Sequence, residues 1–77
     1  MNSLMRVRRE SGLESQQLAK AAGLPLSVEY RAEIGGEISQ EVAESLLLAL
    51  SQLTGEVYTV QEVEINVRPQ WLSTSSN

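Results

Sequence analysis

The sequence contains no cysteine and no histidine. It therefore offers no disulfide framework, thiol nucleophile, imidazole base or zinc-binding cluster of these residues. The longest unbroken apolar run is the five residues Leu46–Leu50, far short of the ~20 that span a bilayer. No apolar stretch follows the N-terminal arginines, so no signal peptide is expected. These absences predict a soluble cytoplasmic protein with no membrane contact, metal, cofactor or small-molecule ligand.

Positive charge is also scarce. The 77 residues hold ten acids and six bases, giving a net charge of −4. Five of the bases lie in residues 1–31 with three acids, whereas residues 32–77 hold one base and seven acids. A chain of this length forms one small domain. If any face of it meets a polyanion such as DNA, the first half supplies that face.

Short helices are indicated along the first half of the chain. The spacing of Leu4, Val7 and Arg8 predicts a helix from about Asn2 to Ser11, ended by Gly12. Leu18, Ala19 and Ala22 recur at helical spacing before Gly23, and Pro25 can open a third helix that Gly35 and Gly36 end. The second helix has only about two turns, so packing must stabilise it.

The second half begins with the longest predicted helix, Gln40 to Thr54, with Ser39 as N-cap and Gly55 as its stop. Thr59 and Glu62 then form a capping-box pattern, which favours a fifth helix over Val60–Ile65. A strand is the competing interpretation, because the same segment is rich in β-branched residues. We expect a domain over residues 1–66 and a tail over 67–77, disordered beyond Leu72.

Together these segments resemble the Xre-type helix-turn-helix domain of phage repressors and similar bacterial regulators. The resemblance covers about Leu4 to Ile65. Its carriers are the residues before Gly12-Leu13, the pair Leu18-Ala19, the run Ala22-Gly23-Leu24, the run Tyr30-Arg31-Ala32-Glu33-Ile34-Gly35 and the leucine-rich fourth helix. It implies a compact, all-α, five-helix lambda-repressor-like fold. It also implies sequence-specific binding of double-stranded DNA to regulate transcription, with the third helix in the major groove.

The resemblance places DNA contacts at the start of the second helix and along the third. The residues at these positions are Ser15, Gln16, Leu26, Ser27 and Arg31. Serine and arginine suit base edges or phosphates, whereas leucine offers only contact with a thymine methyl group. Weaker contacts with backbone phosphates are assigned to three further bases, Arg6, Arg9 and Lys20.

Two features of the sequence concern charged residues in the predicted core. Arg8 lies on the apolar face of the first helix and needs an acceptor there, because an unpaired buried charge is costly. In the family, the matching positions make a structural ion pair, here Arg8 with Glu33. Glu29 stands where the family has a branched apolar residue. Either the third helix is rotated or shifted by one residue, or Glu29 extends outward to solvent.

Two functions remain possible, DNA binding and binding of a protein partner, and enzymatic activity is not expected. Glu14, Glu29 and Glu37 surround the expected DNA face, and Leu26 and Val28 are apolar. These features favour a helix-turn-helix domain that binds a protein partner instead of DNA. Glu41 and Glu44 are three residues apart, but no base, nucleophile or phosphate loop accompanies them.

Self-association is the remaining question. Specific DNA binding by so small a domain favours a homodimer on a two-fold site. Trp71, the one tryptophan, either packs onto the core with Leu72 or anchors such a dimer.

Overall fold

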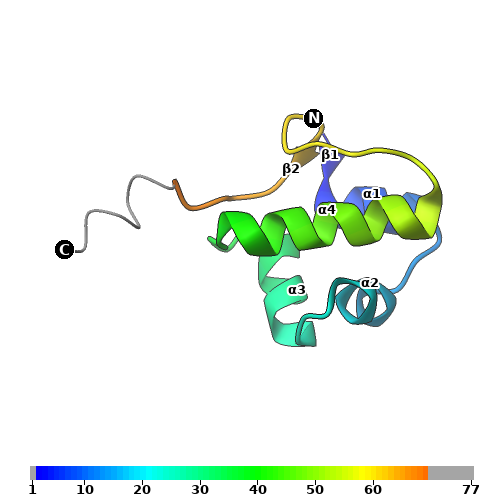
Figure 1. Ribbon diagram of the computed structural model, residues 1–77, viewed down its shortest axis with the longest axis horizontal. Coiled ribbons are helices and arrows are strands. Elements are labelled where there is room, and N and C mark those ends of the chain that lie inside the picture. Colours follow the sequence, from blue (N-terminus) through cyan, green and yellow to red (C-terminus); the bar gives the residue numbers. More distant parts are fainter. Residues whose placement is uncertain (1, 70–77) are drawn as a thin grey trace.

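The computed structural model describes residues 2–69. Four helices and one two-stranded sheet make up this part of the chain (Figure 1). In chain order the elements are β1 (Asn2–Ser3), α1 (Leu4–Glu10), α2 (Ser15–Ala22), α3 (Leu26–Glu33), α4 (Gln40–Thr54) and β2 (Val63–Glu64). The predicted helical class is therefore present, without the fifth helix.

The predicted fourth helix is confirmed as α4, with the expected ends. The Ser39 hydroxyl accepts a hydrogen bond from the Val42 amide at 3.2 Å, which satisfies one free donor of the first turn. Gly55 ends the helix in the left-handed conformation, with φ of 80°. The buried face of α4 consists of Ala43, Leu46, Leu47, Ala49 and Leu50. This face forms the centre of the core, against which α2 packs (Figure 1).

The first helix is shorter than predicted. Asn2 and Ser3 form a strand, and α1 begins at Leu4. The Ser3 hydroxyl caps the helix by accepting a hydrogen bond from the Arg6 amide at 3.1 Å. Asn2 pairs in parallel with Val63, 61 positions along the chain, an interaction that no local pattern encodes.

The prediction of a fifth helix over Val60–Ile65 is wrong. Only one turn forms after Thr59, whose carbonyl accepts hydrogen bonds of 3.0 Å from the amides of Glu62 and Val63. The chain then extends as β2, where Val63 is fully buried and pairs with β1. Burial of this side chain and the pairing outweigh the capping-box signal, so the competing strand interpretation holds for Val63–Glu64.

The extended segment after β2 is hydrogen-bonded to the α3–α4 loop. Ile38 donates its amide to the Asn66 carbonyl at 2.9 Å, and the Arg68 amide donates to the Ile38 carbonyl at 2.8 Å. Paired backbone thus continues beyond residue 66, where we placed the domain boundary. The predictions for Trp71, Leu72 and the disordered tail lie outside the described residues. Within residues 2–69, no helix is long and apolar enough to cross a membrane.

Candidate nucleic-acid interface

α2 presents two of the predicted contact residues on its outward side. Gln17 fixes the start of the helix, because its Oε1 accepts a hydrogen bond from the Glu14 amide at 2.8 Å. Leu18 and Ala19 are buried, which sets the rotation of the helix about its axis. Gln16 and Lys20, four residues apart, are consequently both exposed. They form a polar row along the outward side of α2.

α3 has an inner face of unusual composition. Its buried residues are Glu29, Ala32 and Glu33. Glu29 is fully buried, with an exposed fraction of 0%. The helix is therefore neither rotated nor shifted by one residue, and Glu29 does not reach solvent. Both alternatives from the sequence are wrong, because Glu29 occupies the apolar position itself.

The outward face of α3 carries the other predicted contacts. Leu26, Ser27 and Arg31 are exposed. Tyr30 is also exposed, to 54%, and was not among the predicted contacts. Leu26, Tyr30 and Ile34 follow at intervals of four and expose 49%, 54% and 62% of their surface. The spacing of four is present in the sequence, where Tyr30 and Ile34 serve only as markers of the family resemblance.

Arg31 is held in place by the loop that follows α3. The Gly36 amide donates to the Arg31 carbonyl at 2.8 Å. A Cβ atom at Gly36 would lie 2.5 Å from the Arg31 Cγ, so glycine leaves room for the arginine stem. Arg31 makes no ion pair with any residue in the described part of the chain. Its guanidinium is therefore available to a ligand.

An open depression of about 660 Å³ lies beside Arg31. Its lining combines apolar and charged side chains and consists of Val28, Arg31, Gly36, Glu37, Ile38, Ser39, Val42 and Arg68. Arg68 had not been recognised as part of this region. Its Nε lies 3.3 Å from the Glu37 Oε1 across 31 positions of sequence, which no local signal could reveal.

The acids expected to oppose DNA are placed unevenly. Glu29 is buried behind α3, and Glu37 is paired with Arg68. Glu14 is exposed at the start of α2 and keeps its charge near the predicted interface. Two of the three acids are therefore removed or compensated.

Two predicted phosphate contacts are engaged within the protein. The Ser15 hydroxyl donates to Glu33 Oε2 at 3.1 Å, so it faces the interior and is not free for a phosphate. Arg6 Nε lies 3.2 Å from Glu10 Oε2 in an exposed pair on α1, which weakens its attraction for other anions only slightly. Arg9 and Lys20 are exposed and form no ion pair among residues 2–69.

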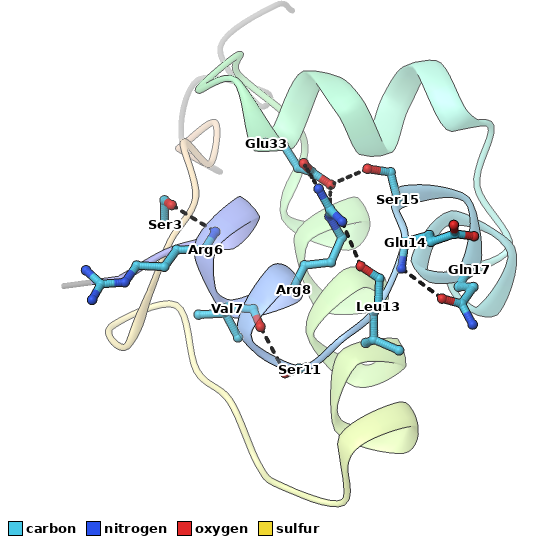
Figure 2. A network of polar contacts seen from close by, with 10 residues as sticks. All are labelled: Ser3, Arg6, Val7, Arg8, Ser11, Leu13, Glu14, Ser15, Gln17 and Glu33. Carbon is cyan, nitrogen blue, oxygen red and sulfur yellow. Dashed lines mark hydrogen bonds and ion pairs between the residues drawn. The ribbon is translucent and has the colours of Figure 1, made fainter.

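Arg8 and Glu33, the two residues paired from the sequence, are in direct contact (Figure 2). Arg8 donates from Nε to Glu33 Oε2 at 2.7 Å and from Nη2 to Oε1 at 3.1 Å. Its Nη1 donates to the Leu13 carbonyl at 2.7 Å. The Ser15 hydroxyl donates to the same Glu33 Oε2 atom and completes the network (Figure 2). The network joins α1, α2 and α3 beneath the predicted interface.

The two buried carboxyls of α3 have opposite pKa shifts. Burial, with the adjacent Glu33, raises the pKa of Glu29 to about 8, although the Arg8 charge opposes this. Burial also acts to raise the pKa of Glu33. The neighbouring Glu29, the hydrogen bonds from Arg8 and Ser15 and the Arg8 charge outweigh burial and lower that pKa. At neutral pH, Glu33 is therefore ionised and Glu29 carries a proton.

The protein has no significant match among family models, curated proteins or solved structures. The resemblance to the Xre-type domain therefore depends on the quoted residues and their spacing. Within residues 2–69 there is also no cluster of three acidic, histidine or cysteine side chains that could hold a metal ion.

Proposed function

We propose that the protein is a small sequence-specific DNA-binding regulator of transcription, with α3 as the helix that enters the major groove. One observation carries this proposal. Both acids of α3 face the interior, so Arg31 is the only charged side chain that the helix presents outward. A helix with an unpaired arginine and no exposed acid suits a groove flanked by phosphates.

The exposed residues divide into two roles. On α3, Arg31 can donate two hydrogen bonds to the O6 and N7 atoms of guanine, and Ser27 can bond to a base edge. On α2, Gln16 and Lys20 are suited to phosphates, where contacts set the position of the protein on the duplex. The Ser15 hydroxyl is bound to Glu33 and is not available to a phosphate. The Ser15 backbone amide lies at the start of α2 and can donate to a phosphate instead.

The electrostatic contribution is small. Arg9, Lys20 and Arg31 give three phosphate or base contacts from bases without an internal partner, and Arg6 would add a fourth. Each phosphate contact contributes about −0.9 to the salt slope, so affinity per protomer depends only moderately on salt. A homodimer on a two-fold site would double these contacts, which supports dimeric binding.

The test is an amide NMR titration with random duplexes of about 20 base pairs at low salt, because non-specific affinity underlies specific binding. We expect shifts at Gln16, Ser27 and Arg31 that fade as salt rises. Arg31→Ala should weaken binding much more than Arg6→Ala, which removes the same charge from α1. Equal effects of the two variants, or no shifts at ~50 mM salt, would contradict the proposal.

A protein-interaction module is the second candidate function, and one specific observation favours it. Leu26, Tyr30 and Ile34 form an exposed apolar row on and just after α3. Such a row could contact a protein partner. Loss of partner binding in Tyr30→Ser, together with no response to DNA, would favour this function over DNA binding.

A further inference from the structure

The inner face of α3 is held by polar side chains and not by large apolar ones. Its buried residues are two glutamates and one alanine. α4, by contrast, buries three leucines and two alanines in the core. Little fully buried apolar surface therefore anchors α3, and two carboxyls occupy most of its inner face.

None of the side-chain donors near these two carboxyls bonds to Glu29. Arg8 gives two of its nitrogens to Glu33 and the third to the Leu13 carbonyl. The Ser15 hydroxyl also donates to Glu33. Both carboxyl oxygens of Glu29 are buried, and no donor in the described part of the chain bonds to them. Glu29 lies next to Glu33, and a hydrogen bond between the two carboxyls requires a proton on Glu29.

An ionised Glu29 would place a second negative charge next to Glu33 in a site with one guanidinium. The charged groups acting on it are Arg8 from α1 and Glu33 from its own helix, while α2 contributes the neutral Ser15. A buried charge without a partner is strongly unfavourable. The site therefore accommodates Glu29 only in its protonated form.

We propose that Glu29 is a proton-dependent latch that keeps α3 docked on α1 and α2. When the carboxyl loses its proton, α3 opens locally and hydrates the charge, while α4, α1 and the β1–β2 pair keep their shared apolar core. The latch concerns folding of α3 and stands without the proposed function. Coupling to DNA affinity, through Ser27 and Arg31 on the same helix, rests on that function.

The expected size of the effect follows from linkage. The docked form holds its proton up to about pH 8, whereas an open, hydrated form has the ordinary pKa of 4.5. Between pH 6 and pH 9 the opening equilibrium of α3 should therefore rise by a factor on the order of 100. The increase occurs as pH rises, because the open state releases its proton first.

The experiment follows amide hydrogen exchange by NMR at pH 6 and pH 9, expressed as protection factors that remove the intrinsic pH dependence of exchange. In the wild type, α3 amides should lose about 100-fold protection over this interval. Central α4 amides should lose much less. Glu29→Gln keeps the size and removes the ionisation, so its α3 protection should not change with pH. Glu41→Gln, an exposed acid on α4, is the matched control and should behave as wild type.

Carboxyl ¹³C shifts in the wild type supply a reading that needs no variant. Titration of Glu29 near its ordinary pKa of 4.5 would overturn the latch, as would equal loss of protection in α3 and α4. If Glu29→Gln fails to fold, Glu29→Met, similar in size and apolar, replaces it and should also abolish the pH effect. Opening of α3 in a protein that binds no DNA at either pH would keep the latch and refute the proposed function.

Discussion

At the scale of single residues, the buried carboxyls of α3 have the greatest consequences. Glu33 is compensated by a two-point hydrogen-bonded arginine, whereas Glu29 is compensated by a proton. The two side chains lie four residues apart on one helix, so their titrations are linked. Stability should depend on pH in a way that neither residue would show alone.

The pH dependence has a definite sign. The folded-state pKa of Glu29 is raised from 4.5 to about 8, so unfolding releases its proton between these values and stability falls as pH rises through this window. The lowered pKa of Glu33 stabilises the fold above its ordinary value, and that contribution is lost in acid. We expect urea denaturation to give maximal stability near pH 4.5, where these two contributions balance, with a loss of a few kcal/mol by pH 9.

Glu29→Met should remove the alkaline loss in the same urea experiment and raise the free energy of unfolding at pH 8. A wild type that is equally stable at pH 6 and pH 9 would contradict this account of Glu29. Glu44→Gln, an exposed change on α4, should leave the pH profile unaltered.

Arg8 should be the most sensitive charged residue. Arg8→Ala leaves Glu33 buried without its main partner and should cost about 3–5 kcal/mol, enough to unfold much of so small a domain. Arg6→Ala breaks the exposed pair with Glu10 and should cost under about 1 kcal/mol. Circular dichroism with urea titration measures both. Similar costs would show that the buried network is not critical.

At the scale of elements, signals close in sequence predicted most of the helices. Ser39 and Gly55 mark both ends of α4, and Gly23 ends α2, because caps and left-handed glycines act within one turn. The segment after Thr59 was misjudged because its conformation depends on a distant strand. Pairing of Asn2 with Val63 was invisible to any local pattern.

The β2 segment should therefore be more important to stability than its length suggests. Val63 is fully buried, whereas Val60 in the preceding turn is 46% exposed. Val63→Ala should cost about 2 kcal/mol, and Val60→Ala less than about 0.5 kcal/mol. Thermal or urea unfolding compares these matched substitutions. A larger cost at Val60 would contradict burial of β2 in the core.

Two neighbouring glycines in the loop after α3 should respond differently to substitution by alanine. Gly35 has φ of 87° with open space around it, so Gly35→Ala should cost about 1 kcal/mol through strain. A Cβ at Gly36 would lie 2.5 Å from the Arg31 Cγ and 3.1 Å from the Arg31 carbonyl, so Gly36→Ala should displace that side chain, reduce DNA affinity and lower stability. Unchanged DNA binding in Gly36→Ala, in a protein that binds DNA, would show that the position of Arg31 is unimportant.

At the scale of the whole molecule, the net negative charge disfavours DNA binding, whereas the charge on the outward side of α3 favours it. The chain carries −4 in total, yet the outward side of α3 displays only a positive charge. Folding produces this contrast by burying Glu29 and Glu33 and by pairing Glu37 with Arg68. Binding should consequently be local, moderate in affinity and centred on the α2–α3 side.

The salt dependence tests this view of the interface. Lys20→Ala should make the slope of log affinity against log salt shallower by about one unit per protomer, through loss of one phosphate contact. Fluorescence anisotropy with a labelled duplex over a range of salt concentrations measures the slope. An unchanged slope would place Lys20 outside the interface.

The sequence by itself determined α2, α3 and α4, the Arg8–Glu33 pairing and the location of positive charge in the first half. These features depend on neighbours within a turn or on a resemblance carried by spacing. Tertiary structure alone decided that Glu29 is buried, that Ser15 faces inward and that Val63–Glu64 forms a strand. Each of these outcomes depends on which distant groups share the interior, because burial and pairing free energies outweigh local preference where the two conflict.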